Sequence, residues 1–319
     1  MSEKLLEVRN LRTYFYTMRD VVRAVDGVNL DMNSGEGLGL AGESGCGKST
    51  LAYSIVRLVP PPGRIVDGQV IFKGIDILRM DESEFRKKVR WRGISMIFQG
   101  AMNALNPVYT IGDQLAEVLM LHENLTKKEA LEEASRLLEM VGIERKRLKS
   151  YPHELSGGMK QRVVIAMALA LKPPLVIADE PTTALDVVVQ AQIMNLLKKL
   201  KKELQLSIML ISHDLSIIAE IADKLTIMYG GRIVERGPSD SVYLDPKHPY
   251  TQGLLGAIPR LKGELRSLAW IPGAPPDLTR PPPGCRFAPR CKYASERCQK
   301  DPHEVEVGKD HYVACWLYA

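Results

Sequence analysis

The chain has 319 residues, 45% of them hydrophobic, which is enough for one large or two modest domains with ordinary buried cores. Its net charge of +5 is spread along the chain and does not by itself indicate a nucleic-acid-binding protein. The longest apolar runs, 163–171 and 207–211, are far shorter than the roughly 20 residues that cross a bilayer, so we expect no membrane span. The beginning carries Glu3 and Glu7 without a basic end followed by an apolar stretch. We therefore expect no secretory signal and a cytoplasmic chain with reduced thiols.

Short apolar runs rich in β-branched residues alternate with amphipathic stretches, the pattern of an α/β protein. The expected strands are LLEVRNL, VNLDM, GLGLAG, GQVIFKG, ISMIFQ, LVIADE, SIMLIS and KLTIMYGGRIVERG. A helix over 190–204 is predicted between LVIADE and SIMLIS, which read as buried parallel strands. Its apolar face is formed by Ile193, Leu196, Leu197, Leu200 and Leu204. Between 103 and 171 helical periodicity replaces the strand pattern, which predicts a helical subdomain inserted into the α/β core.

The segment Gly42–Thr50, GESGCGKST, fits the phosphate-binding pattern G-x-x-x-x-G-K-[ST]. It follows the predicted strand GLGLAG and opens the predicted helix STLAYSIVRLV, a context that a chance glycine turn does not explain. Its glycines let backbone N–H groups turn toward an anion, Lys48 reaches the β- and γ-phosphates, and the Ser49 hydroxyl ligates Mg²⁺. We interpret Cys46 as a small side chain that fills space within the loop and not as a ligand.

An acidic pair ends the apolar run LVIADE. Asp179 lies at the carboxyl end of a predicted buried strand, where doubly wound sheets bind ligands, and is expected to hold Mg²⁺. Glu180, one residue further, is placed to accept a proton from the water that attacks the γ-phosphate. Such a pair alone is commonly a cap or a solvated feature, and it is the phosphate loop that favours the catalytic interpretation.

The segment Leu155–Arg162, LSGGMKQR, precedes an apolar helix over 163–171. Ser156 is a good N-cap for this helix. Capping does not account for the two glycines, whose missing side chains leave backbone N–H groups open to an anion.

LSGGMKQR, lying between a phosphate loop and LVIADE, resembles the signature sequence of ATP-binding-cassette (ABC) proteins. Gln99 in MIFQ resembles the Q-loop of that family, 184–186 the D-loop, and His213 in ISHD the switch histidine. The resemblance covers residues 1 to about 237. It implies a nucleotide-binding domain over 1–240 with a P-loop NTPase fold: a mainly parallel core sheet, an antiparallel β subdomain and a helical subdomain at about 103–171.

The resemblance further implies an ATPase in which two cassettes face head to tail. Ser156 and Gly158 would then complete the ATP site of the partner. His213 would contact the γ-phosphate and hold the attacking water, and Gln99 would bind Mg²⁺ and couple hydrolysis to a permease. The implied catalytic residues are Lys48, Gln99, Glu180 and His213. The implied contacts to ATP and Mg²⁺ are Phe15, Ala24, Ser44, Gly45, Cys46, Gly47, Lys48, Ser49, Thr50, Gln99, Asp179, Ser156 and Gly158.

In this family adenine stacks on an aromatic residue upstream of the phosphate loop. The sequence offers Tyr14, Phe15 and Tyr16. Counting from the strand at Leu11 favours Phe15, and the short insertion TMRDV leaves the two tyrosines open, since stacking needs only a π-face.

Two further segments, 247–261 (KHPYTQGLLGAIPRL) and 98–115 (FQGAMNALNPVYTIGDQL), resemble the ATPases of dipeptide and oligopeptide importers. The first lies in an expected extension over 241–270. The resemblance implies a different, sibling ATPase subunit, two membrane permease subunits and an external substrate-binding protein as partners, with this chain peripheral on the cytoplasmic face of the membrane and no nucleic acid bound. Oligosaccharides and metal complexes stay open as alternative cargo.

The last expected domain, 271–319, joins a proline-rich connector to a tail with four cysteines. The cysteines are spaced Cys285-x5-Cys291-x6-Cys298-x16-Cys315. Four thiolates can hold an iron–sulfur cluster or zinc, although zinc sites usually use pairs two to four residues apart. Similar importer tails carry a [4Fe–4S] cluster, which we favour here in a structural role. The tail's basic residues, expected to offset the charge of the cluster, are Arg286, Arg290, Lys292 and Arg297.

Two other functions remain possible for this motif set. A cassette protein without a permease could act on ribosomes, nucleic acid or cluster assembly, but the ribosome-recycling type has two cassettes and amino-terminal clusters. A regulatory cassette that binds ATP without hydrolysing it would lack the base, whereas Glu180, His213 and a complete signature are present here.

Overall fold

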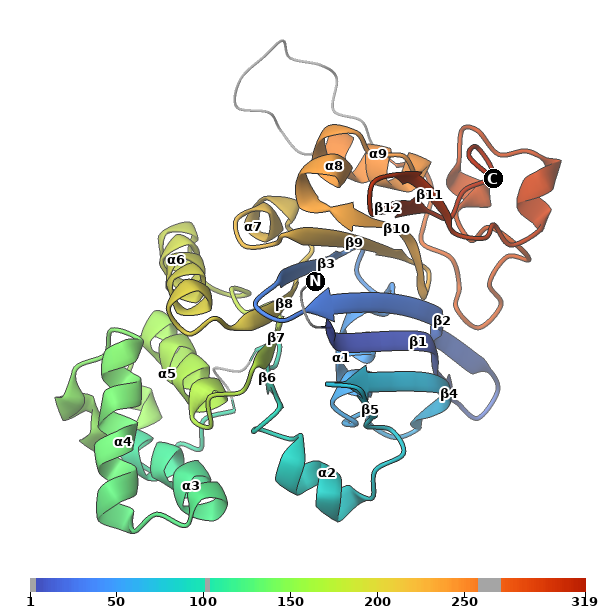
Figure 1. Cartoon of the computed structure of the whole chain (residues 1–319). Helices are drawn as coiled ribbons and strands as arrows, with labels where there is room; N and C mark the ends of the chain where they lie inside the picture. The colour runs from blue at the N-terminus through green and yellow to red at the C-terminus, as the bar shows by residue number, and fades with distance from the viewer. Residues whose placement is uncertain (1–3, 101–103, 258–270) are drawn as a thin grey trace. The chain divides into compact units, whose positions relative to one another are not determined.

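The computed structural model describes residues 4–100, 104–257 and 271–319 (Figure 1). It consists of two compact units: a first unit, Asn33–Glu36 and Arg79–Leu210, and a second unit, Lys4–Met32, Gly37–Leu78 and Ile211–Ala319. Parts of several predicted segments lie outside the described residues. They are Glu3, the start of the helical segment at 103, residues 101–103 and 258–261 of the importer-like segments, and residues 258–270 of the expected extension over 241–270. No helix in the described ranges is long and apolar enough to span a membrane.

The second unit contains an antiparallel sheet and the helix that follows the phosphate loop (Figure 1). The strands lie in the order β2-β1-β4-β5, with bounds β1 Lys4–Tyr16, β2 Val21–Asn33, β4 Gly63–Phe72 and β5 Ile75–Asp76. Helix α1, Lys48–Ile55, is tied to β1 by a 2.7 Å hydrogen bond between the hydroxyls of Thr13 and Ser54. Both side chains are buried, so the bond fixes the helix against the sheet.

Five further strands of the second unit lie in the order β11-β12-β10-β9-β3. Their bounds are β3 Gly37–Ala41, β9 Lys224–Tyr229, β10 Arg232–Pro238, β11 Val305–Gly308 and β12 His311–Val313. The single run expected at KLTIMYGGRIVERG is wrong: it forms the antiparallel pair β9 and β10, because Gly230 and Gly231 take φ of 54° and 83° and reverse the chain. The end of the chain adds to this sheet, since Tyr312 of β12 pairs with Arg236 of β10.

Short helices connect and follow these strands. They are α7 Leu215–Ala219, α8 Ser239–Leu244, α9 Pro249–Gly256 and two 3₁₀ turns, Ala288–Arg290 and Glu296–Gln299. Pro249 begins α9, where its missing N–H costs no helical hydrogen bond, and His248 caps the helix.

The first unit places three strands in the order β8-β7-β6, with β6 and β7 parallel. Their bounds are β6 Ile94–Ile97, β7 Leu175–Asp179 and β8 Ser207–Ile211. Every residue of β7 and β8 is buried, which confirms the prediction that LVIADE and SIMLIS form buried strands.

The helices of the first unit are α2 Glu82–Lys88, α3 Ile111–Glu123, α4 Lys127–Met140, α5 Gly157–Leu169 and α6 Val187–Glu203. Two 3₁₀ turns, Arg145–Lys149 and Pro152–Glu154, precede α5. Helices α3, α4 and α5 pack on one another (Figure 1). Thr126 and Glu129 form a capping box that begins α4.

Helix α6 starts three residues earlier than predicted because Asp186 caps it. Four of the five residues of its expected apolar face are buried: Ile193, Leu196, Leu197 and Leu200. The placement of Leu204 on that face is wrong. Leu204 is the C-cap, and its side chain is 43% exposed because the helix ends at Glu203.

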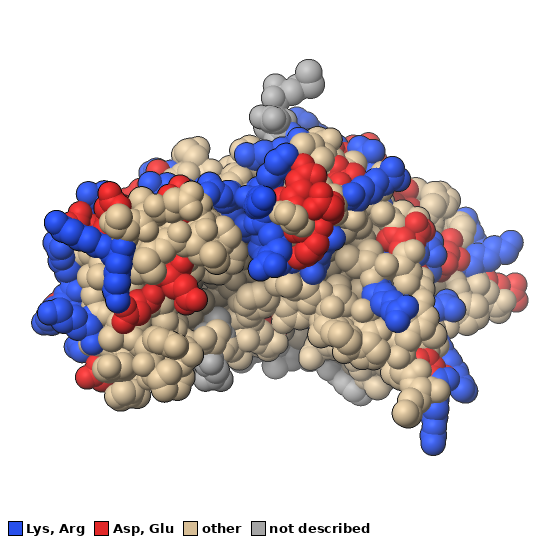
Figure 2. All heavy atoms as spheres, turned by 90° about the horizontal axis from the view of Figure 1, so that it is seen from below, with Lys and Arg blue, Asp and Glu red and all other residues tan. Residues whose placement is uncertain are grey.

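On the face drawn in Figure 2, lysine and arginine side chains lie among aspartate and glutamate side chains, and broad areas carry neither. This mixture agrees with the small net charge of the chain.

Candidate functional site

The loop before α1 requires glycine at two of its positions. Gly42 and Gly47 take φ of 152° and 107°. An added Cβ would lie 2.1 Å from the Met228 carbonyl oxygen at Gly42 and 2.0 Å from the Ala24 carbonyl oxygen at Gly47. At Gly45 an added Cβ would meet no described atom within 4 Å, so this side of the loop is open. The loop therefore packs tightly on β2 and β9 and presents its other side, with the amino end of α1, to an anion.

Lys48 lies over its own loop and is only 6% exposed. Its ammonium donates to the backbone oxygens of Gly42 at 2.7 Å and Glu43 at 2.9 Å. These acceptors are uncharged, so they satisfy the donors without neutralising the positive charge. Cys46 is buried within the loop, and its Sγ lies 3.7 Å from Lys48 Nζ. Burial raises the pKa of the Cys46 thiol. Ser44 is exposed, and Ser49 and Thr50 are half-buried in the first turn of α1.

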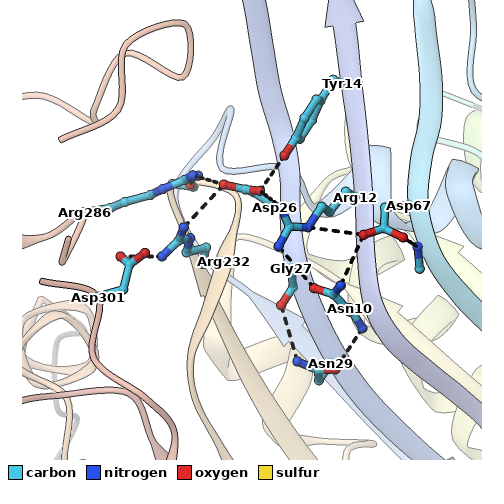
Figure 3. Close-up of polar contacts among 12 residues, drawn as sticks. Asn10, Arg12, Tyr14, Asp26, Gly27, Asn29, Asp67, Arg232, Arg286 and Asp301 are labelled. Atoms are coloured by element: carbon cyan, nitrogen blue, oxygen red, sulfur yellow. Dashed lines mark hydrogen bonds and ion pairs between the residues drawn. The ribbon is translucent and has the colours of Figure 1, made fainter. Parts of the chain in front are cut away.

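The three aromatic candidates at the end of β1 lie in different surroundings. The Tyr14 hydroxyl donates to Asp26 Oδ1 at 2.6 Å (Figure 3). Phe15 is half-buried and faces Gly63, where an added Cβ would lie 2.7 Å from its ring. Tyr16 is 45% exposed. Ala24, on β2, is buried, with its carbonyl against the loop at Gly47.

Asp26 is a buried carboxylate that several elements of the second unit share (Figure 3). Besides Tyr14, it accepts from Arg286 of the tail and from Arg232 of β10 at 3.4 Å. Burial favours its protonated form, but these donors outweigh that effect and lower the pKa of Asp26. Arg232 in turn pairs with Asp301. Asp26 was not identified from the sequence, and no local pattern marks it.

In the first unit, Glu180 and Gln99 meet at the ends of adjacent strands. Asp179 ends β7 with 0% exposure, and Glu180 follows with φ of 46°, a left-handed conformation uncommon outside glycine. Glu180 Oε2 accepts hydrogen bonds from Gln99 Nε2 at 3.0 Å and from Thr183 Oγ1 at 2.9 Å. The sequence indicated separate roles for Gln99 and Glu180 but did not indicate that they are in contact. It also gave no sign that Thr183 donates to Glu180.

The signature segment and the D-loop are neighbours in the first unit. Ser156 caps α5 by accepting from the Met159 N–H at 3.4 Å, which confirms the predicted N-cap. An added Cβ at Gly158 would lie 2.6 Å from Val189 Cγ1 in the first turn of α6. Asp186, at the end of the D-loop, caps α6 by accepting from the Val189 N–H at 2.9 Å. Ser156 is exposed at the surface.

His213 lies two residues after the end of β8. It belongs to the second unit, and its side chain is exposed. Asp214, next to it, caps α7 by accepting from the Ser216 N–H at 2.9 Å. The predicted site residues thus divide between the units. The second unit carries the phosphate loop, the aromatic candidates and His213, and the first carries Gln99, Asp179, Glu180 and the signature segment.

The four tail cysteines line one small cavity of about 40 Å³. All five cysteines of the chain are free thiols. Burial raises the pKa of Cys285 to about 11 and also raises the pKa of Cys291 and Cys315. His248, Phe287 and Trp316 complete much of the wall. Within the part of the chain that the structure describes, no group of three or more His, Cys, Asp or Glu side chains is placed to hold a metal ion.

Two protein-family models match the chain. The model described as ABC transporter matches residues 25–183, and the one described as oligopeptide/dipeptide transporter, C-terminal region, matches residues 234–298. The first covers the phosphate loop, the signature segment and the acidic pair. The second covers three of the four tail cysteines.

Curated relatives are similar over the whole chain. The dipeptide transport ATP-binding protein DppD of Bacillus subtilis is 47% identical, over 99% of this chain and 95% of that protein. The oligopeptide transport ATP-binding protein OppD of Escherichia coli is 50% identical, over 99% of this chain and 94% of that protein.

Solved structures match about three quarters of the chain. A dimeric post-hydrolysis state of the ATP-binding cassette MJ0796, bound to ADP and Pi, has a TM-score of 0.66 and 29% identity, covering 74% of this chain and 99% of that chain. The structure of cbiO1 from Clostridium perfringens, part of an ABC transporter complex, also has a TM-score of 0.66, with 28% identity and coverage of 76% and 92%.

Proposed function

The chain belongs to the family of dipeptide and oligopeptide transport ATP-binding proteins, and from this membership we propose that it hydrolyses ATP to power import of short peptides through a membrane ABC transporter. The observation that carries the proposal is identity of 47–50% over essentially the whole chain, including the C-terminal region that the transporter model describes.

The phosphate loop binds the polyphosphate of ATP. Its backbone N–H groups and the amino end of α1 supply an anion site, and Lys48 exchanges its bonds to the loop carbonyls for the β- and γ-phosphates. Ser49, Gln99 and Asp179 are the residues that would hold Mg²⁺, which when bound neutralises charge on those phosphates. We assign the adenine to Phe15, whose hydrophobic ring has no hydroxyl to engage, whereas the Tyr14 hydroxyl already binds Asp26.

Glu180 acts as the base that accepts a proton from the attacking water, and His213 orients that water against the γ-phosphate. The 3.0 Å bond from Gln99 supports this assignment, because the amide fixes the direction of the carboxylate before the reaction. Gln99 would bind Mg²⁺ through its Oε1, so its Nε2 can keep the bond to Glu180 while the metal is held. The bond therefore couples the position of Gln99 to the orientation of the Glu180 carboxylate.

Ser156 and Gly158 complete the ATP site of a second cassette, which is a sibling ATPase subunit. Exposure of Ser156 and Gly157 supports this role, since it leaves the amino end of α5 open at the surface. The remaining partners are two membrane permease subunits and, through them, an external substrate-binding protein. The chain acts at the cytoplasmic face of the membrane.

Cys285, Cys291, Cys298 and Cys315 hold a [4Fe–4S] cluster. The proposal is supported by their place around one cavity, by their free thiols and by the Cys285 N–H, which donates to the Cys298 carbonyl at 3.0 Å. It requires the thiols to close around the cluster, because the described side chains do not form a ready metal-binding group. Bound there, the cluster cross-links a tail that has little core of its own.

The test of the function uses the chain assembled with its sibling and permease subunits in liposomes. Glu180→Gln is expected to abolish ATP turnover while ATP binding continues and a cassette dimer accumulates. The control Glu203→Gln removes an exposed carboxylate that pairs with Lys199 at 3.9 Å and is expected to turn over normally. Normal turnover by the Glu180 variant would refute its role. ATP-driven uptake of an oligosaccharide in place of peptides would refute the cargo.

A further inference from the structure

Glu43, a carboxylate within the phosphate loop, is held by two residues from the C-terminal part of the chain. The two terminal nitrogens of Arg290 donate to the two oxygens of Glu43, at 2.8 Å and 3.1 Å. The Glu43 N–H donates to the Tyr250 hydroxyl at 2.9 Å. All three residues belong to the second unit. A bidentate pair of this kind fixes both the position and the orientation of a carboxylate.

Arg290 is itself rigidly placed. Its side chain is 7% exposed, and its guanidinium also donates to the Pro272 carbonyl at 2.8 Å and to the Tyr229 hydroxyl at 3.2 Å. Cys291, one of the cysteines that line the tail cavity, is the next residue along the chain. Arg290 therefore links the tail directly to the phosphate loop.

An aromatic cluster supports the Tyr250 contact. The fully buried Tyr250 ring lies 4.5 Å from the ring of Tyr229, which meets Phe287 of the tail edge-on at 5.2 Å. Since phenylalanine would pack in the same way, the hydroxyl of Tyr250 is the part that serves the loop.

A second arginine of the tail makes a parallel connection. Arg286, the residue after Cys285, forms an ion pair with Asp26 in which both side chains are buried, and it also donates to the carbonyl of Gly230 (Figure 3). Gly231, next to Gly230, donates to the Cys46 carbonyl of the phosphate loop at 2.9 Å. Arg286 and Arg290 are therefore already paired with carboxylates of the nucleotide-binding part, whereas the sequence suggested that they offset the charge of a cluster.

The charge of Glu43 makes its pairing important for nucleotide binding. A carboxylate in a loop that binds phosphates would repel the polyphosphate if it stood uncompensated. Arg290 neutralises that charge and holds the loop backbone at the same time.

We propose that Arg290 and Tyr250 are positioning residues of the nucleotide site, which act through Glu43 so that the affinity for ATP depends on the C-terminal tail being docked on the phosphate loop. The inference rests on the proposed function, since it assumes that the loop binds ATP. It gives the tail a part in nucleotide binding in addition to its own folding.

The experiment measures the Kd of the purified full-length chain for trinitrophenyl-ATP and, by competition, for ATP. Arg290→Gln is expected to raise the Kd roughly 2- to 30-fold, the range that contiguous polar networks commonly transmit. Tyr250→Phe is expected to raise it by a smaller factor, with the aromatic packing kept. Lys309→Gln, which removes an exposed positive charge of the tail that does not line the tail cavity, is the matched control and should bind as the natural chain does.

A double-mutant cycle separates positioning through Glu43 from a general loss of stability. If Arg290 acts through Glu43, Arg290→Gln combined with Glu43→Gln should bind no more weakly than Glu43→Gln alone. Additive losses in the double variant, or an unchanged Kd in Arg290→Gln and Tyr250→Phe while the natural chain binds ATP, would overturn the inference and leave the proposed function standing. Absence of ATP binding by the natural chain would overturn both.

Discussion

The amide of Gln99 donates to the carboxylate of Glu180 at 3.0 Å, across 81 residues of sequence and between the ends of two adjacent parallel strands. Both strands belong to the first unit, so the contact is a property of that unit alone. It joins the residue proposed to sense Mg²⁺ and the permease to the residue proposed as the base. Control of hydrolysis can therefore operate through one hydrogen bond.

Replacing Gln99 tests this relationship. Gln99→Ala is expected to lower kcat of the assembled transporter about 100-fold, the loss that follows removal of one oriented donor at a reacting centre. The measurement is steady-state phosphate release over a range of ATP concentrations. Gln205→Ala, which removes an exposed amide that donates to the Lys202 carbonyl at 3.0 Å, serves as the control. Equal activities of the two variants would contradict the role of Gln99.

Gly158 permits a test that separates packing from function. Gly158→Ala places a Cβ 2.6 Å from Val189 Cγ1 and is expected to lower the free energy of unfolding by about 1–3 kcal/mol. Adding Val189→Ala relieves that clash and should restore most of the stability, as measured by urea unfolding. ATP turnover should stay low in the double variant if the open backbone at Gly158 serves the site of a second cassette. Recovery of turnover together with stability would mean that Gly158 serves packing only.

His248 predicts a dependence of stability on pH. Burial lowers its pKa to about 3 from an ordinary value of 6.5, while its Nδ1 accepts from the Tyr250 N–H at 3.0 Å. Below pH 6.5 the unfolded chain binds a proton that the folded chain excludes. The free energy of unfolding should therefore fall as the pH decreases from 6.5 toward 3, by up to about 1.4 kcal/mol per pH unit.

His248→Asn keeps a capping acceptor and removes the titration. Between pH 6.5 and pH 5 its unfolding free energy should depend on pH less steeply than that of the natural chain. The difference in slope should correspond to the uptake of up to about one proton on unfolding. His153→Asn, at an exposed position in the first unit, should keep the steeper dependence. Identical slopes in the His248 variant and the natural chain would contradict the buried, neutral histidine.

The proposed cluster is tested by its removal. Anaerobically purified chain is expected to contain about four irons with matching sulfide and to absorb visible light. Cys298→Ser should lose this iron, whereas Cys46→Ser should keep it, because Cys46 lies in the phosphate loop and not at the tail cavity. Loss of the cluster should also lower the thermal stability of the chain, since it cross-links the tail. Zinc in place of iron, or an unchanged iron content in Cys298→Ser, would exclude the cluster.

The sequence alone determined the local parts of this protein. The phosphate loop, the N-cap at Ser156 and the buried strands at LVIADE and SIMLIS all follow from short-range rules: glycine conformations, side-chain capping and apolar run length. Errors arose where local rules compete, as when two glycines reversed KLTIMYGGRIVERG into a hairpin and when α6 ended before Leu204.

The tertiary structure decided which of these parts meet. The pair Arg290 and Glu43 spans 247 residues, and Gln99 and Glu180 span 81. Neither pair has a spacing or pattern that a local reading could detect, because the contact exists only after strand order and chain return have brought distant segments together. The sequence shows which residues are charged and would need a partner if buried, whereas the tertiary structure determines which residue that partner is.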